Sequence, residues 1–213
     1  MKAFVIAMDN EAQTVIGNLS GAVEERLFGR RVVKGKLNGE DVAVIVSGIG
    51  IANAAAATQL ALSAFAPDEI YNIGVAGGLD PEMEVGDLYE VESAVQYDFD
   101  LTKINGTEFG TLDERDSPYI PFSPKGKHPA KILGSGDRFN DDPDDNALLL
   151  RLGAGLRDME GAAIANVCEK AGVECRSLKC VSDVYGKGAT TGQYLEKLAK
   201  CMKILTGAVP AYV

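Results

Sequence analysis

The sequence of 213 residues has a single histidine, only four cysteines and no long apolar run. The histidine, His128, lies in a loop of Pro, Lys and Gly between Ser123 and Pro129, which is typical of a surface position. A Ser-His-Asp or Cys-His mechanism would have to use His128, so both are poor explanations of any activity. No group of residues has the spacing of a metal site, and we expect neither a metal nor a cofactor.

The cysteines and the net charge indicate the redox state of the protein and the partners that it is not expected to bind. None of the cysteines forms a C-x-x-C pair, so we expect all four to be reduced, with Cys168 and Cys180 in the core. The net charge of −10 repels phosphate backbones and argues against nucleic-acid binding. No apolar run reaches the ~18–20 residues of a membrane span, and the N-terminus carries no cleavage signal. We therefore expect a cytoplasmic protein without a nucleic-acid or membrane partner.

Apolar runs alternate with helical patterns along the chain, which favours one α/β domain over residues 1–213 with a mixed sheet. The turn Asn38-Gly39 predicts a hairpin. The predicted strands are 3–8, 31–37, 42–47, 69–73, 85–97, 131–133 and 178–181. One helix is predicted to start after Asp9 or Asn10, and a second at about residue 51. Three more are predicted over 146–152, 161–171 and about 191–205, and the acidic run 141–145 is expected to cap the first of these three. The polar segment 98–129 lacks periodicity and is expected to be functional or mobile.

Three carboxylates occur where strands and helices meet. Glu11 falls in the first turn after the first strand, Glu160 opens a helix, and Asp183 is expected just past the end of strand 178–181. Ligands of open α/β sheets bind at the carboxyl ends of the strands, so these positions suggest acid–base chemistry on a polar small molecule. Favourable charges at helix N-termini and loop caps explain the same positions equally well.

Two glycine-rich turns also follow strands. The turn Gly48–Gly50 resembles half of a dinucleotide fingerprint, but Asn53 replaces the last glycine and no acidic residue follows at the usual distance. It suits an anion or a sugar at a helix N-terminus better. In the second turn, Gly74–Leu79, glycines permit a ligand to approach the backbone closely, although a tight turn alone would also need them.

Eight short motifs appear in an order and at a spacing typical of one family. They cover residues 6–11, 37–39, 47–50, 74–79, 85–87, 135–139, 158–160 and 181–183. With these motifs the chain resembles the nucleoside phosphorylase/nucleosidase superfamily and, more narrowly, the 5′-methylthioadenosine/S-adenosylhomocysteine nucleosidases. The resemblance implies a three-layer α/β/α sandwich with a central mixed sheet, a nucleoside substrate, hydrolysis of its N-glycosidic bond, and a homodimer whose partner subunit covers the 5′ pocket.

The resemblance also implies a role for each matched residue. Asp183 would be the general acid at purine N7, positioned by Ser182, and Glu11 would polarise the attacking water. Glu160 and Met159 would hold the ribose. The remaining implied binding residues are Phe139, which would stack on the base, the backbone of Asn140, which would read its edge, and Ile49, Val75, Ala76, Gly77, Asp158 and Lys179.

Glycosidic cleavage independently calls for an acid at the leaving group and a base near the water. On this reading Asp183 needs a raised pKa, and Glu11 stays ionised.

Three positions depart from the family pattern. The family has serine at Val75, arginine at Lys179 and glutamate at Asp158. Valine removes a hydroxyl donor, and a lysine point charge does not reproduce a guanidinium fork. The 5′-substituent of the substrate therefore stays open.

Two other functions stay open beside hydrolysis. One is a phosphate-dependent phosphorylase, for which Arg30 or Arg31 would have to supply charge. The other is a nucleoside-binding protein with weak catalysis, although such a protein has no need of an acid at each end of its pocket.

Overall fold

The computed structural model describes residues 1–113, 115–139 and 142–213. Its strands are β1 (Lys2–Ile6), β2 (Ser20–Leu27), β3 (Arg30–Leu37), β4 (Glu40–Val46), β5 (Glu69–Gly78), β6 (Leu88–Gln96), β7 (Ile120–Pro121), β8 (Ala130–Ser135), β9 (Ala154–Asp158) and β10 (Glu174–Val184). Its helices are α1 (Asp9–Ile16), α2 (Ile51–Phe65), α3 (Thr102–Asn105), α4 (Pro143–Arg151), α5 (Gly161–Ala171) and α6 (Thr190–Tyr212).

The described strands form one mixed sheet in the order β10-β6-β8-β9-β5-β1-β4-β3-β2, with β7 added beside β6. Strand β5 lies at its centre, parallel to β1 on one side and to β10 on the other. Because β10 also pairs with β6, the strands β10, β6, β8, β9 and β5 close on themselves. The parallel strands β1, β4, β5 and β10 thus bring their carboxyl ends to the same edge of the sheet.

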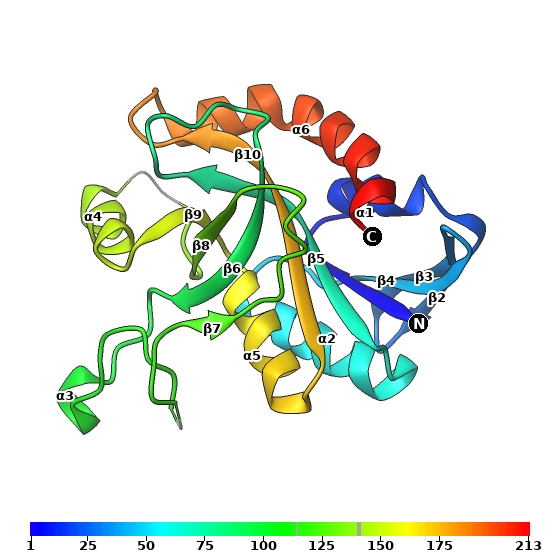
Figure 1. Cartoon of the computed structure of the whole chain (residues 1–213), viewed down its shortest axis with the longest axis horizontal. Coiled ribbons are helices and arrows are strands. Elements are labelled where there is room, and N and C mark those ends of the chain that lie inside the picture. Colours follow the sequence, from blue (N-terminus) through cyan, green and yellow to red (C-terminus); the bar gives the residue numbers. More distant parts are fainter. Residues whose placement is uncertain (114, 140–141) are drawn as a thin grey trace.

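Helices cover both faces of the sheet (Figure 1). On one face, α2 and α5 pack through alanines and other small side chains onto apolar residues of the strands. On the other, α1 and α6 bury Val15, Leu205, Val209 and Tyr212 against β1, β4 and β5. The expected three-layer α/β/α sandwich with a central mixed sheet is confirmed.

Local signals located most elements correctly. Asn38 and Gly39 both have a positive φ, 53° and 86°, and join β3 to β4 in the predicted hairpin. The acidic run does cap α4, because the Asp142 carboxylate accepts the backbone N–H of Asp144 at 2.9 Å. All four cysteines are unpaired, and Cys168 and Cys180 are buried, as expected; Cys175 and Cys201 are buried too.

Several predicted boundaries were wrong. Most of the expected turn Gly74–Leu79 lies inside β5, which runs to Gly78, and α4 starts at Pro143 rather than at 146. Asp183 lies inside β10, not beyond its end, because β10 pairs with β5 as far as Val184. Helix α1 starts at Asp9 with Met8 as its N-cap, so neither expected capping residue holds that position. Helix α6 continues through Pro210 to Tyr212 because its apolar face stays buried against the sheet. Strands β2, β7 and β9 and the short helix α3 were not predicted. Strand β2 is largely exposed, β7 and α3 lie in the segment 98–129 that lacks periodicity, and β9 is five residues long with Gly and Arg in it.

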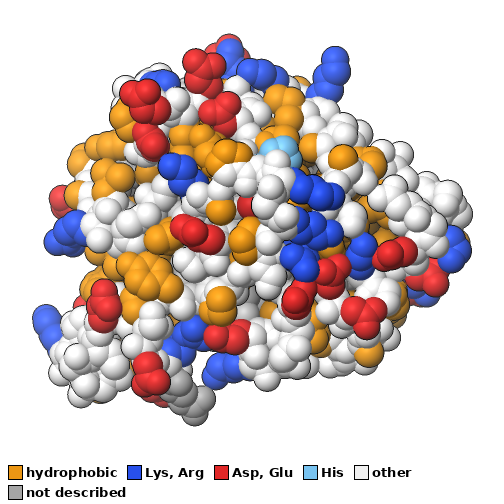
Figure 2. All heavy atoms as spheres, viewed as in Figure 1, with side chains coloured by type: hydrophobic (Ala, Val, Ile, Leu, Met, Phe, Trp, Pro, Cys, Tyr) orange, Lys and Arg blue, Asp and Glu red, His pale blue; other side chains and the backbone are white. Residues whose placement is uncertain are grey.

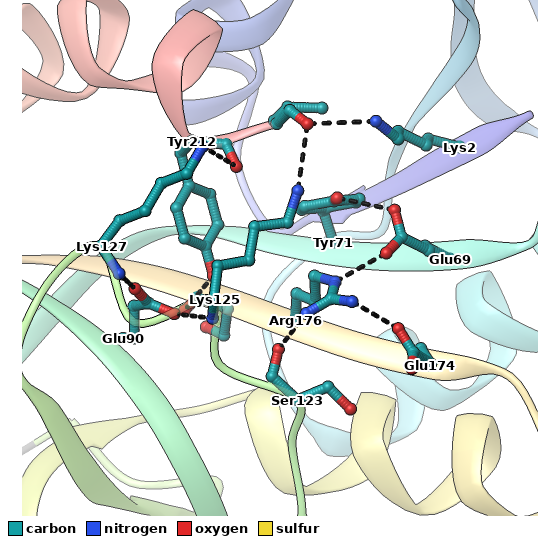
Figure 3. Close-up of polar contacts among 12 residues, drawn as sticks. Lys2, Glu69, Tyr71, Glu90, Ser123, Lys125, Lys127, Glu174, Arg176 and Tyr212 are labelled. Carbon is teal, nitrogen blue, oxygen red and sulfur yellow. Dashed lines mark hydrogen bonds and ion pairs between the residues drawn. The ribbon is translucent and has the colours of Figure 1, made fainter.

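A polar cluster stabilises the edge of the sheet where β1, β5 and β10 begin (Figure 3). The buried Glu90 carboxylate accepts backbone N–H groups from four consecutive residues, 125 to 128. Lys125 Nζ and Lys2 Nζ donate to the carbonyl of Val213 at 3.0 and 3.1 Å. This cluster therefore ties loop 123–129 and the end of α6 to the sheet. His128, the one histidine of the chain and the pale blue side chain in Figure 2, is partly exposed at the surface, as expected.

No helix in the described part of the chain combines the length and apolar character needed to cross a membrane.

Candidate active site

A cavity of about 370 Å³ opens where the parallel strands end. Its walls come from the β1–α1 junction, the end of β5, the β9–α5 junction, the end of β10, the loops after β4 and β8, and α6. The expected site residues that line it are Glu11, Ile49, Val75, Ala76, Gly77, Phe139, Asp158, Met159, Glu160, Ser182 and Asp183. Residues separated by more than 170 positions in the chain thus meet in one pocket.

Two expected residues are not among the lining residues. Lys179 is buried beneath the cavity floor, where its Nζ lies 2.9 Å from Asp158 Oδ2. Asn140 lies outside the described residues.

The turn between β1 and α1 places Glu11 in the cavity with only 4% of its surface exposed. Its Oε1 accepts the N–H of Val75 at 2.8 Å, and its Oε2 accepts the N–H of Met8 at 3.3 Å. A Cβ on Gly74 would lie 2.5 Å from Oε1, so only glycine permits this approach of strand and carboxylate. Glu11 therefore bonds back to the start of the helix, and its side chain also lines the cavity.

Glu160 is the N-cap residue of α5, yet its carboxylate makes no helix-capping bond. Instead Oε1 accepts the N–H of Gly50 at 2.8 Å, across 110 residues of chain. The capping bonds come from Asp158, whose carboxylate accepts the N–H groups of Glu160 and Gly161 and the hydroxyl of Ser135. Glu160 therefore faces the cavity while Asp158 holds the β9–α5 turn.

The turn Gly48–Gly50 is not the open anion cradle that its sequence suggested. The Gly50 N–H donates to Glu160, and the next one, of Ile51, donates to Asp137 Oδ1 at 2.8 Å. Two of the amides at the start of α2 are therefore bonded to the protein's own carboxylates.

Asp183 lies on the opposite wall, 2% exposed. The Ser182 hydroxyl donates to its Oδ2 at 2.8 Å. Arg157, which the sequence analysis missed, brings Nη2 to within 3.8 Å of Oδ1. Because β9 itself was not predicted, no local signal placed Arg157 in the pocket.

The mouth of the cavity is apolar. Phe139 is half exposed and meets Tyr194 edge to face, with ring centroids 5.4 Å apart. The Tyr194 hydroxyl lies 3.5 Å from Met8 Sδ. Tyr194, Met8, Ala7 and Arg138 also line the cavity and were missed; for Tyr194 the amphipathic pattern of α6 was the available signal.

Burial is the largest influence on the pKa values of the charged residues at the cavity. Loss of solvent raises the pKa of Glu11, although the Val75 N–H and Lys179 oppose the rise. Loss of solvent, with the negative charge of Asp158 next, raises the pKa of Glu160 to about 8. Burial alone would lower the pKa of Lys179, but Asp158 outweighs it and the pKa is raised, so Lys179 stays charged. The cavity thus contains two carboxyl groups, Glu11 and Glu160, whose pKa is raised by burial, a feature that is frequent at functional sites.

Comparison with known proteins identifies the family of the chain and agrees with its fold. A family model described as the phosphorylase superfamily matches residues 2–212. Curated 5′-methylthioadenosine/S-adenosylhomocysteine nucleosidases of Marinomonas sp. (strain MWYL1) and Geobacillus kaustophilus (strain HTA426) are 34% and 33% identical to the chain. The alignments cover 85% and 94% of this chain and 84% and 92% of those proteins.

A solved 5′-methylthioadenosine/S-adenosylhomocysteine nucleosidase from Helicobacter pylori, bound to butyl-thio-DADMe-Immucillin-A, has the same fold. It superposes with a TM-score of 0.90 at 24% identity over 99% of this chain and 96% of that one. The chain belongs to the phosphorylase superfamily and, within it, to the 5′-methylthioadenosine/S-adenosylhomocysteine nucleosidase family. The family and fold expected from the eight motifs are confirmed.

Proposed function

We propose that the protein hydrolyses the N-glycosidic bond of adenine nucleosides of the 5′-methylthioadenosine and S-adenosylhomocysteine type, releasing adenine and a 5-substituted ribose. The observation that carries the proposal is a pair of buried carboxylates, Glu11 and Asp183, that line one cavity from different elements. Glycosidic hydrolysis needs an acid at the leaving group and a base beside the water.

In this proposal Asp183 protonates purine N7 as the bond breaks, since an adenine anion is a poor leaving group. The Ser182 hydroxyl, 2.8 Å from Oδ2, holds the carboxyl group in place. Glu11 accepts a proton from the attacking water. The N–H groups of Val75 and Met8 hold its carboxylate in place, and burial raises its pKa, which makes the carboxylate a stronger base than an exposed one.

Glu160 would hold the ribose hydroxyls, with Met159 against the sugar. Its carboxyl group faces the cavity and makes no capping bond in α5, which supports a ligand-binding role. Phe139 would stack on the base. Ile49 and Phe139 are 51% and 50% exposed at the cavity mouth, which supports a homodimer whose partner subunit covers the 5′ group.

Water suits this cavity better than phosphate as the nucleophile. A phosphate dianion requires several fixed donors and cations. The amides of Gly50 and Ile51 donate to protein carboxylates, Lys179 pairs with Asp158, and Val75 offers no hydroxyl. Arg30 donates to the carbonyl of Ser47 and Arg31 to Asp9 and Glu24, so both are bonded elsewhere.

The test is turnover of 5′-methylthioadenosine and adenosine in phosphate-free buffer, with adenine and the sugar product identified by chromatography. We expect free pentose and a rate that phosphate does not change. Strict dependence on phosphate, with a sugar 1-phosphate as product, would instead establish a phosphorylase. Tight nucleoside binding without turnover would establish a binding protein.

A further inference from the structure

Arg157 gives the cavity a cation that the proposed mechanism does not use. Its side chain leaves β9 beside Asp158 and is 12% exposed, and its Nη2 lies 3.8 Å from Asp183 Oδ1. Two elements hold it there: Nη1 donates to Asn146 Oδ1 of α4 at 3.0 Å, and Nη2 donates to Thr190 Oγ1 of α6 at 3.1 Å. The guanidinium is therefore fixed at the wall that carries Asp183.

Gly77 of β5 lies between these two groups, because it pairs with Arg157 of β9 and with Asp183 of β10. A Cβ on Gly77 would lie 3.0 Å from Arg157 Nε and 3.0 Å from Asp183 Oδ1, so glycine lets both side chains approach the strand. All three residues line the cavity, so one bound ring can contact both groups. Arg138 also lines the cavity, but its side chain is 55% exposed and pairs with Asp145 at 2.8 Å. Arg157 is thus the buried guanidinium next to the residue assigned to purine N7.

Purines differ at the position beside N7. N7 is an acceptor in every purine, whereas C6 carries a donating amino group in adenine and an accepting oxygen in hypoxanthine and guanine. A protonated carboxyl group matches adenine, because it donates to N7 with one oxygen and accepts from the amino group with the other. A 6-oxopurine presents two acceptors and needs a second donor. Arginine has five N–H groups, only donates, and is always charged.

We propose that Arg157 donates to the 6-oxo group of purine bases bound at Asp183, so that the protein cleaves nucleosides of 6-oxopurines as well as those of adenine. Asp183 protonates N7 of both kinds of base, and Arg157 decides which substituent at C6 is tolerated. The inference rests on the proposed function and extends its substrate class.

The experiment compares kcat/KM for 5′-methylthioadenosine and 5′-methylthioinosine, which differ in the substituent at C6 and in the proton that the 6-oxopurine carries on N1. The native protein should cleave the two within about tenfold of each other. In Arg157→Leu the ratio of the inosine to the adenosine substrate should fall by about 10- to 100-fold, the value of one hydrogen bond to a charged group. The ratio isolates this contact, because both substrates need N7 protonation.

Arg151→Leu is the matched control. Arg151 is exposed on α4, outside the cavity, and its replacement removes the same charge. Its substrate ratio should equal that of the native protein. If Arg157→Leu does not fold, Arg157→Gln, which keeps a polar group near Asn146, should still lower the ratio. Calorimetry with hypoxanthine and adenine should show the same loss for hypoxanthine alone.

The possible failures are distinguishable. Two outcomes would overturn the inference and leave the proposed function standing. One is cleavage of adenine nucleosides without cleavage of 5′-methylthioinosine. The other is a ratio of kcat/KM for the two substrates that is the same in the native protein and in both Arg157 variants. If neither nucleoside is cleaved, the proposed function itself is wrong. An equal loss of hypoxanthine and adenine binding would make Arg157 a structural residue and overturn the inference.

Discussion

Glu160→Gln should make the protein more stable at neutral pH while removing a group of the candidate site. Glu160 is 7% exposed, and burial followed by the charge of Asp158 raises its pKa to about 8 from an ordinary value of 4.5. At pH 7 this carboxyl group is ionised in the unfolded chain and protonated in the folded one. Folding must therefore take up a proton, which disfavours the folded state.

The sign and size follow from proton linkage. Between pH 4.5 and 8 the folded state holds a proton that the unfolded state has lost, so the free energy of unfolding falls as pH rises. From pH 4.5 to 7 the cost grows by about 1.4 kcal/mol per unit, to about 3 kcal/mol as an upper bound. Glutamine avoids this cost, and its carbonyl oxygen can still accept the Gly50 N–H. The variant should gain about 1–3 kcal/mol at pH 7 and almost nothing near pH 4.5.

Urea unfolding of both proteins at several pH values between 5 and 8 measures the effect. The difference in free energy of unfolding should widen steadily with pH. Glu82→Gln, which removes an exposed carboxylate outside the cavity, should follow the native pH dependence. A Glu160→Gln variant that is no more stable at pH 7, or whose pH dependence matches that of the native protein, would refute the reasoning.

Three further substitutions test the remaining assignments. Asp183→Asn should keep the fold, checked by circular dichroism, and lower kcat on 5′-methylthioadenosine by about a hundredfold or more; nearly normal turnover would exclude the acid role. Glu11→Gln should lose turnover but still bind adenine with a sugar mimic in calorimetry, and parallel loss of binding would contradict a role on water. Glu90→Gln should cost about 2 kcal/mol in urea unfolding at pH 7, because the four backbone N–H groups lose a charged acceptor. Burial alone would raise the pKa of Glu90, but these hydrogen bonds lower it. The contribution of the Glu90 carboxylate to the free energy of unfolding is therefore present above pH 4.5 and should fade as the pH falls through the lowered pKa. A stability difference between the native protein and Glu90→Gln that does not change with pH would argue against the ionised form.

Local patterns were sufficient where neighbouring residues decide the conformation. The turn Asn38-Gly39 tolerates positive φ at both positions, so the hairpin β3–β4 follows from two residues. The apolar runs predicted the strands β1, β4 and β5, whose carboxyl ends lie at the cavity. Six of the eight motifs then contributed residues to the lining of the cavity, whereas 37–39 and 85–87 are not part of it.

Tertiary structure alone decided what each site residue contacts. Glu160 meets Gly50 across 110 residues, and Lys179 is held beneath the cavity by Asp158, pairings that no local pattern contains. Arg157 reached the pocket on β9, a five-residue strand whose formation depends on its pairing with β5 and β8. The raised pKa of Glu160 has the same origin, because burial depends on the elements that close over a side chain. Residue type and position along the chain set which groups reach the sheet edge, and packing between distant segments set their partners and their charge.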